Sequence, residues 1–287
     1  MSGTSHKGYL LQSPALSFLF RARLRKTLPA RMLYRRKRNR GGDVYLISFP
    51  KAGRTWLRIM LGKVLALHYG LEDSGLLELH RLAETRPGIP RIRLKHDDNP
   101  QKKTPKELVT LKYEYRDRKV ILLIRDIRDL AVSNYFEVTR RRHFFNGDLS
   151  SYLRCKRGSV DSMIGFYNIW ADNRDAAADF LLVRYEDIHA DTDRELRRIL
   201  DFIGIKDVSP STIREAIDFS SFENMRKMEL GDDLDSGRLR AADSKDPESF
   251  KTRKGKVGGY TEYLSEEEIE ELTRRIREEL SPFYGYP

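Results

Sequence analysis

A short polar turn near residue 50 holds the first residues of the sequence that could do chemistry. Lys51, Gly53 and Thr55 follow an apolar run and precede a helical pattern. Backbone N–H groups at such a turn can bind an anion, and the dipole of the following helix favours negative charge there. Lys51 would add a cation, Gly53 would let the backbone come close, and Thr55 would supply a hydroxyl. The turn does not match the Walker A pattern, and in isolation it could equally be a surface loop with a solvated lysine.

Two further segments could bind an anion. Arg125 follows a second apolar run, in the same kind of position as Lys51, and Ser133 lies two turns along the helix predicted to come next. Arg253 and Lys254 precede Gly255, a flexible residue that would let them close over a phosphate. Each cation alone could simply be solvated, but the three segments together favour a ligand with two separated anionic groups.

Five segments, in this order, resemble the cytosolic-type sulfotransferase family over residues 43 to 280. Residues 49–56 (FPKAGRTW) are similar to the family's 5′-phosphosulfate loop, and residues 125–133 (RDIRDLAVS) to its 3′-phosphate segment. The other matches are 185–187 (YED), 220–225 (SSFENM) and 253–258 (RKGKVG). The resemblance implies a P-loop-like strand, loop and helix that bind 3′-phosphoadenosine 5′-phosphosulfate. It also implies sulfuryl transfer to an acceptor hydroxyl or amine, with no metal required.

The same resemblance assigns the residues that contact the donor. Those implied around the 5′-phosphosulfate are Lys51, Ala52, Gly53, Arg54, Thr55 and Trp56. Those implied at the 3′-phosphate are Arg125, Ser133, Arg253, Lys254 and Gly255. Tyr185, Ser220 and Phe222 would complete the adenine pocket beside Trp56. Aromatic side chains suit a purine, although Trp56 and Phe222 could equally be core residues.

The resemblance also implies three catalytic residues. His96, in the element Leu94-Lys95-His96, takes the place of the family's general base in an in-line transfer. Lys51 would stabilise the charge that develops on the leaving phosphate oxygen, and Ser133 would restrain Lys51 until the acceptor arrives. Position alone distinguishes His96 from His68 and His80, because an isolated histidine is usually a surface or core residue.

Two departures from the family pattern fall inside this site. Leu94 stands where the family has a lysine, so that Lys95 or Arg93 would have to supply the charge. Arg54 stands where the family usually has a small hydroxyl residue, and it could grip the sulfate or point into solvent. The family's C-terminal dimer element is not recognisable, which leaves the oligomeric state open.

Two other classes of function compete with a sulfotransferase. A P-loop-like nucleotide phosphotransferase is disfavoured because the Walker lysine–hydroxyl pair and a magnesium carboxylate are missing. A non-catalytic module could bind anionic lipid or nucleic acid through a basic N-terminal arm. For a sulfotransferase, the acceptor could be a small molecule, a lipid-linked group or a carbohydrate. The loops at 139–157 and 229–249 would select it, and the second of these is expected to be a mobile surface loop or lid.

Apolar patterning predicts the elements that position these residues. Continuous apolar runs predict buried strands at 44–49, 120–124 and 180–183. Helices are predicted after each strand, with Gly70 and Gly204 as terminators and capping boxes at Thr192–Glu195 and Ser265–Glu268. Strands that alternate with helices predict a single α/β domain with a central parallel sheet, whose ligand lies at the carboxyl ends of the strands.

The excess positive charge belongs to the N-terminus. Residues 1–40 hold eleven of the 54 Lys and Arg residues and no acid, which leaves 43 basic and 43 acidic side chains in the rest of the chain. The resulting division is a basic amphipathic arm over 1–40 and a catalytic domain over 41–287. A helix from Pro14, with Leu16, Phe20, Leu24 and Leu28 on one face, could pack on the domain, contact a membrane through residues 14–40, or be a transit peptide.

Composition limits the remaining partners and the location. The neutral body argues against a nucleic-acid partner, and no apolar run approaches the roughly 20 residues that span a bilayer. Cys155 is the one cysteine, which excludes an internal disulfide and a cysteine-based metal cluster. These observations predict a cytoplasmic protein, with peripheral membrane contact as the alternative.

Overall fold

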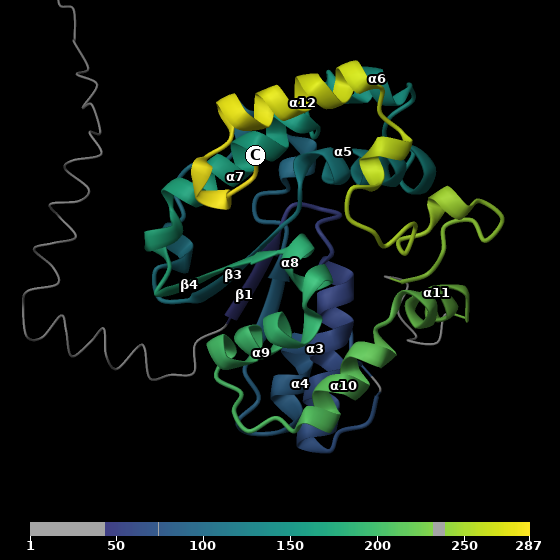
Figure 1. The fold of residues 1–287 in the computed structure, drawn as a ribbon. Helices are drawn as coiled ribbons and strands as arrows, with labels where there is room; N and C mark the ends of the chain where they lie inside the picture. The colour runs from purple at the N-terminus through teal and green to yellow at the C-terminus, as the bar shows by residue number, and fades with distance from the viewer. Residues whose placement is uncertain (1–43, 74, 232–238) are drawn as a thin grey trace, which may run out of the picture. The chain divides into compact units, whose positions relative to one another are not determined.

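Four parallel strands form the centre of the fold, in the order β2–β1–β3–β4 (Figure 1). The computed structural model describes residues 44–73, 75–231 and 239–287. The strands are β1 (Val44–Ser48), β2 (Ile92–Lys95), β3 (Lys119–Ile124) and β4 (Asp179–Arg184). The predicted α/β fold with a central parallel sheet is confirmed.

The two central strands are buried along almost their whole length. Four of the five residues of β1 and five of the six of β3 are buried. Because successive side chains of a strand point to opposite faces of the sheet, burial of nearly all of them requires that both faces be covered. The sequences of β1 and β3 are continuous apolar runs because both faces of the sheet are covered.

Strand β2 was not predicted, and its position in the sheet explains why. It lies at the edge, pairs with β1 from Val44↔Ile92 to Ile47↔Lys95, and buries Ile92 alone of its four residues. Two of its side chains are basic, so the short segment carries no apolar run. The pairing nevertheless places the residue that follows it, His96, beside the end of β1.

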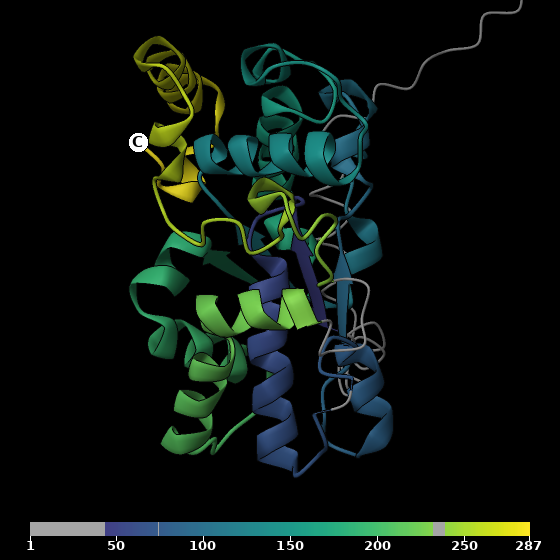
Figure 2. The same ribbon diagram turned by 90° about the vertical axis from the view of Figure 1, so that its right-hand side faces the viewer.

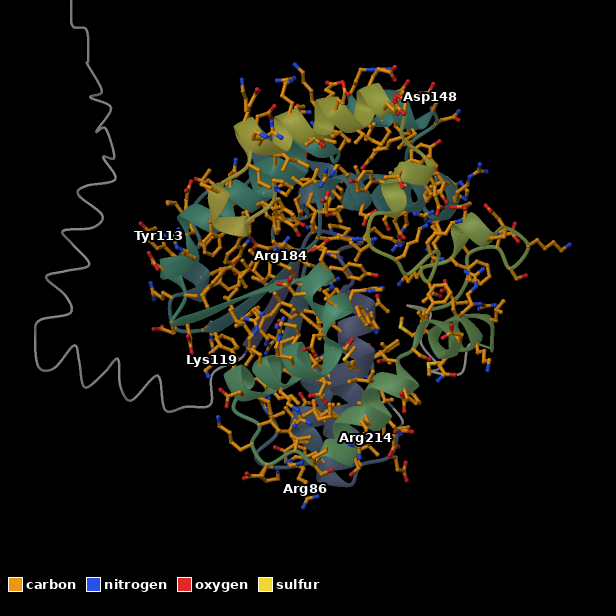
Figure 3. All side chains as sticks on the ribbon, viewed as in Figure 1. Arg86, Tyr113, Lys119, Asp148, Arg184 and Arg214 are labelled. Atoms are coloured by element: carbon orange, nitrogen blue, oxygen red, sulfur yellow. The ribbon has the colours of Figure 1, made fainter. Side chains whose placement is uncertain are left out.

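Helices lie on both sides of the sheet (Figures 1 and 2). One side carries α3 (Arg54–Tyr69), α4 (Leu79–Thr85), α9 (Thr192–Ile203) and α10 (Pro210–Phe219). The other carries α5 (Ile127–Phe136), α7 (Val160–Asp172) and α12 (Glu266–Glu279). The shorter helices are α6 (Leu149–Leu153), α8 (Tyr185–Ala190) and α11 (Phe222–Gly231). Charged side chains such as Arg86 and Arg214 lie around the outside of this arrangement (Figure 3).

Local sequence signals set most of the predicted helix ends. Gly70 and Gly204 end α3 and α9 in the left-handed conformation, as predicted. The capping box of Ser265 and Glu268 at the start of α12 is also confirmed. The predicted box at Thr192 is wrong, because the carboxylate of Asp191, one residue earlier, accepts the N–H of Arg194 and caps α9. The Thr192 hydroxyl instead donates to the carbonyl of Ile188.

The strand order creates a crevice at one end of the sheet. From β1 the chain crosses to β2 on one side, and from β3 it crosses to β4 on the other. The loops after the adjacent strands β1 and β3 therefore diverge, and ligands of open parallel sheets bind at such a switch point. The predicted anion-binding turns begin at these two strand ends.

A buried polar cluster fixes the chain directly after His96. Asp97 is 5% exposed and accepts hydrogen bonds from the Tyr115 hydroxyl (2.6 Å) and Trp170 Nε1 (3.1 Å). Its carboxylate also pairs with Lys112 Nζ at 2.7 Å. Asp97, Asp98 and Asn99 all have positive φ, so the chain turns sharply there. The cluster holds this strained turn, and with it the position of His96.

Part of the predicted mobile loop at 229–249 is ordered structure. Glu229 belongs to α11 and is 1% exposed, and 247–249 form a short 3-10 helix. Buried contacts of Glu229 with Arg141 and the amides of Lys251 and Thr252 anchor this region, which corrects the prediction for these residues. Residues 232–238 and the whole basic arm lie outside the described residues. Among the described residues, no helix is long and apolar enough to cross a membrane.

Replacing Asp97 by alanine should destabilise the fold strongly. The change leaves the buried Lys112 ammonium without its carboxylate, and breaking a buried ion pair typically costs about 3 to 5 kcal/mol. Urea denaturation should show this loss in the free energy of unfolding. Asp193→Ala is the control, because it breaks an exposed pair with Arg197 worth about 0 to 0.5 kcal/mol. Equal effects of the two changes would contradict this role for Asp97.

Candidate active site

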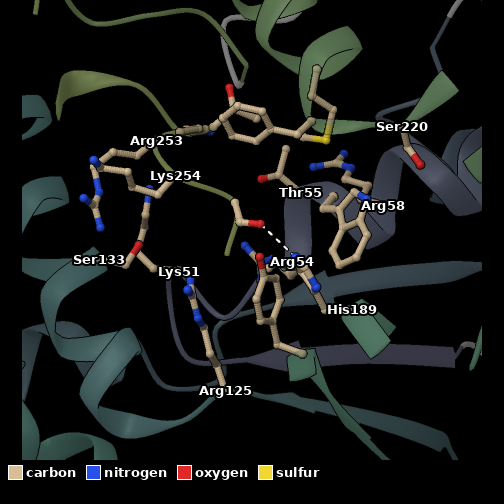
Figure 4. Close-up of a pocket in the computed structure, with 18 of the residues that line it drawn as sticks. Lys51, Arg54, Thr55, Arg58, Arg125, Ser133, His189, Ser220, Arg253 and Lys254 are labelled. Carbon is tan, nitrogen blue, oxygen red and sulfur yellow. Dashed lines mark hydrogen bonds between the residues drawn. The ribbon is translucent and has the colours of Figure 1, made fainter. Parts of the chain in front are cut away.

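The carboxyl ends of all four strands contribute residues to one cavity of about 500 Å³ (Figure 4). Its walls contain every residue predicted to bind the donor except Ala52, and all three residues predicted to be catalytic. These are Lys51, Gly53, Arg54, Thr55, Trp56, His96, Arg125, Ser133, Tyr185, Ser220, Phe222, Arg253, Lys254 and Gly255. Residues of this set separated by as many as 204 positions in the sequence, Lys51 and Gly255, thus meet at the predicted end of the sheet.

The turn after β1 has the geometry of an anion-binding loop. Lys51 and Gly53 both adopt positive φ, of 73° and 97°. A Cβ atom on Gly53 would lie 2.6 Å from Tyr185 Cδ2, so the close approach of these two segments requires glycine. Helix α3 begins at the next residue, and its first residues line the cavity; the first amides of a helix have no partner within it. Ala52 does not line the cavity, because its side chain is in the core and its amide donates to the carbonyl of Phe49.

A carboxylate pairs with Lys51 in this structure. Lys51 Nζ lies 3.2 Å from Glu137 Oε2, and the restraint of Lys51 by Ser133 stays a prediction. Glu137 opens the π-helical turn η4 (Glu137–Arg141), one helical turn after Ser133. Burial lowers the pKa of Lys51. Burial alone would raise the pKa of Glu137, but the charges of Lys51 and Arg141 hold it down to about 2.

The second cationic group lies at the end of β3 and in the segment 253–255. The Arg125 guanidinium lies 4.3 Å from the centre of the Tyr185 ring and 3.4 Å from Asp129, and it donates to the carbonyl of Lys256. Arg253 pairs with Glu248 at 3.0 Å. These contacts orient both guanidinium groups while leaving them in the cavity wall.

Aromatic side chains form the wall between the two cationic groups. The rings of Trp56 and Tyr185 lie 5.6 Å apart, and His189 packs near both. His189 Nε2 donates to the carbonyl of Gly255 at 2.9 Å (Figure 4). Phe222 is 39% exposed, so it is not a core residue, and a Cβ on Gly255 would lie 2.4 Å from its ring. The Phe222 ring therefore packs directly on the backbone of the segment that carries Arg253.

Hydrogen bonds at both ring nitrogens define the state of His96. His96 Nδ1 donates to the carbonyl of Ser48 at 3.0 Å, because a carbonyl can only accept. Its Nε2 therefore carries the lone pair, and it accepts a 2.6 Å hydrogen bond from Arg54 Nη2. Burial, followed by the charge of Arg54, lowers the pKa of His96 to about 3.

Neither proposed replacement for the family's lysine lies in the cavity wall. Lys95 points away and pairs with Glu114 at 3.1 Å, and Arg93 does not line the cavity. The cations that act on His96 are Arg54 and Lys251. The chain has Leu94 where the family has a lysine, and the cations near His96 come instead from other segments of the chain.

Sequence reasoning missed several cavity residues that carry charge or hydrogen bonds, among them Arg58, Glu137, Arg142, His189 and Lys251. Glu137 stands four residues after Ser133, so helical periodicity could have placed both on one face. Lys251 stands two residues before Arg253, and His189 stands one turn after Tyr185. Within the described parts of the chain, no group of three or more His, Cys, Asp or Glu side chains could hold a metal ion.

Comparisons with known proteins identify the family of this chain. The family model described as "Sulfotransferase domain" matches residues 41–283. Cytosolic sulfotransferase 12 of Arabidopsis thaliana is 23% identical over 82% of this chain and 76% of its own length. Flavonol 3-sulfotransferase of Flaveria bidentis is 25% identical over 83% of this chain and 81% of its own length.

Solved structures share the fold. A mouse sulfotransferase complexed with PAP superposes with a TM-score of 0.58 at 21% identity, over 83% of this chain and 86% of its own. A retinol dehydratase in complex with androsterone and PAP gives a TM-score of 0.59 at 20% identity, over 84% of this chain and 81% of its own.

Removing the charge of Glu137 should lower the pKa of Lys251. Burial and the nearby Lys51 and Arg141 hold this pKa at about 8, while the negative charge of Glu137 raises it. In Glu137→Gln the Lys251 ammonium should therefore lose its proton below pH 8, as measured by NMR titration of isotope-labelled lysine. Glu248→Gln, whose carboxylate pairs with Arg253, is the control and should leave Lys251 unchanged. An unchanged or higher pKa in Glu137→Gln would contradict the counter-charge role of Glu137.

Proposed function

The chain belongs to the sulfotransferase domain family, and on that premise we propose that His96 is the general base of its reaction. The enzyme transfers a sulfuryl group from 3′-phosphoadenosine 5′-phosphosulfate to an acceptor. One observation carries the assignment of the base. His96 Nε2, with its lone pair fixed by the Nδ1 bond to Ser48, lies in the same cavity as the anion-binding turn at Lys51.

The cavity fits a nucleotide with anionic groups at two ends. We assign one anion to the turn at Lys51 and the first amides of α3, and the other to Arg125, Ser133, Arg253 and Lys254. The aromatic wall between them suits a purine. Gly53 and Gly255 support this assignment, since a Cβ on either would collide with an aromatic ring of that wall.

The donor supplies a sulfuryl group bonded to a phosphate oxygen. As the acceptor oxygen bonds to sulfur, the phosphate leaves with the electrons of the S–O bond that breaks. His96 Nε2 takes the acceptor proton, and the Nδ1–H bond to Ser48 orients the ring as its charge develops. Lys51 and the backbone amides of the turn stabilise the charge on the leaving phosphate. Lys51 must leave Glu137 to do so.

For the acceptor we propose a small molecule with a hydroxyl group. Support comes from the relatives, since one is named for flavonols and a structural neighbour was solved with androsterone. Lipid-linked and carbohydrate acceptors are the alternatives. We further propose that residues 41–287 form the catalytic domain, that residues 1–40 are an appended arm, and that the protein is cytoplasmic, as the name of one relative suggests. Contact of the arm with a membrane surface is the alternative role for residues 14–40.

Replacing His96 by alanine should abolish turnover while leaving nucleotide affinity nearly intact. Loss of a general base typically costs roughly 10²- to 10⁴-fold in rate, whereas the proposed nucleotide contacts lie elsewhere in the cavity. Turnover is measured by mass spectrometry with labelled donor and a panel of soluble phenols and alcohols. Affinity is measured by calorimetry with adenosine 3′,5′-bisphosphate.

Two comparison variants make this result specific. Lys51→Ala should weaken both nucleotide binding and turnover, because Lys51 contacts the donor. His68→Ala, on the same helix as Arg54 but outside the cavity wall, should leave both unchanged. If His96→Ala retained turnover within a few-fold, His96 would not be the base.

Deleting residues 1–40 should leave sulfuryl transfer to a soluble acceptor within a few-fold of the full chain. All proposed donor and base residues lie from residue 51 onward, and they are positioned by the sheet and its helices. The same mass-spectrometric assay measures the rate. A complete loss of transfer by a folded truncated protein would show that the arm takes part in the reaction.

A further inference from the structure

Arg54 occupies the lone pair that the proposed base needs. The neutral imidazole of His96 has one lone pair in its plane, on Nε2, because Nδ1 carries the proton donated to Ser48. Arg54 Nη2 donates to this lone pair at 2.6 Å, which is short for such a bond. A nitrogen whose lone pair accepts a hydrogen bond from arginine cannot at the same time take a proton from an alcohol. The structure therefore shows His96 with its reactive nitrogen covered.

The same contact weakens the base electrostatically. Arginine keeps its charge at all relevant pH values, and its positive charge opposes protonation of the ring. Together with burial it lowers the pKa of His96 to about 3, with Lys251 acting in the same direction and Glu137 opposing them. A general base works best when its pKa is near the working pH. Loss of the Arg54 contact would therefore raise the pKa of His96 toward the range that suits a general base.

We propose that Arg54 is a positioning residue that covers His96 until the sulfate of the donor draws its guanidinium away. This inference rests on the proposed function, since it requires the donor and the role of His96. Arg54 is the first residue of α3 and directly follows the anion-binding turn. Both His96 and an anion held by that turn are therefore within reach of its side chain.

Exchanging His96 for the sulfate of the donor as a partner is favourable for the Arg54 guanidinium. A sulfate offers several charged oxygens to its planar donors, and such paired, charge-assisted bonds are stronger than one bond to a neutral imidazole. Departure of the positive charge and arrival of a negative one both raise the pKa of His96. The donor thus uncovers and strengthens the base, and an acceptor that arrives first meets an inactive histidine.

The test follows His96 by nitrogen NMR, independently of turnover. In protein labelled with ¹⁵N-histidine, the Nε2 resonance is assigned by its loss in His96→Asn. We expect 3′-phosphoadenosine 5′-phosphosulfate, added without acceptor, to move this resonance from its hydrogen-bonded position toward that of an uncovered nitrogen. Adenosine 3′,5′-bisphosphate, which lacks the sulfate, should move it much less.

Two variants test the contact between Arg54 and His96 by mutation. Arg54→Ser should show the uncovered Nε2 resonance in the free protein and raise the KM for the donor roughly ten- to a hundredfold, because a charge-assisted bond to the donor is lost. Arg58→Ser is the matched control, since Arg58 lies one turn along α3 in the same cavity and pairs with Glu78. It should leave the resonance in place.

Each outcome bears on the inference. If the donor binds and leaves the Nε2 resonance unchanged, or moves it no more than the bisphosphate does, Arg54 does not uncover His96 and the inference fails alone. The inference also fails if the Nε2 resonance of ligand-free Arg54→Ser is the same as that of the unmodified protein. If the donor does not bind at all, both the inference and the proposed function fail.

Discussion

Burial of several positive charges in one cavity is the constraint on which this site depends. Burial, and then the charges of Lys51 and Arg141, lower the pKa of Lys251, and a buried charge is costly unless it is compensated. Glu137 and Glu229 supply the compensation from two separate helices. The protein thus holds an anion-binding surface ready for its ligand, with internal carboxylates as temporary partners of its cations.

A second requirement is that the base stay fixed while these cations exchange partners. His96 is held on one side by the carbonyl of Ser48, at the end of β1, and on the other by the turn whose first residue, Asp97, is bonded in the core. Neither anchor takes part in the network around Glu137. In the proposed reaction, the cations would therefore move between carboxylate and ligand without displacing the ring proposed to accept the proton.

Patterns confined to one segment predicted much of the fold and many of the residues that line the cavity. The apolar runs of β1, β3 and β4 and the turn at Lys51 are local, and they were found. Strand β2 was missed because an edge strand with two basic residues carries no apolar run. The pairing of Glu137 with Lys51 joins residues 86 positions apart. No local sequence pattern predicts which charged side chains will pair over such a separation. The cap at Asp191 was missed because two adjacent residues could both cap, and only backbone geometry chooses between them.

Arg54 shows how a single departure from a family pattern can be interpreted only in three dimensions. In the sequence it is an additional cation with two possible roles, sulfate ligand or solvated side chain. In the structure it donates a hydrogen bond to His96 Nε2, the nitrogen proposed to accept the proton, 42 positions away in the chain. A small hydroxyl side chain at this position could not reach across the cavity to His96. Arginine at this position therefore makes the state of the proposed base depend on a charged neighbour. A ligand that binds the guanidinium more strongly than the imidazole does would remove this contact.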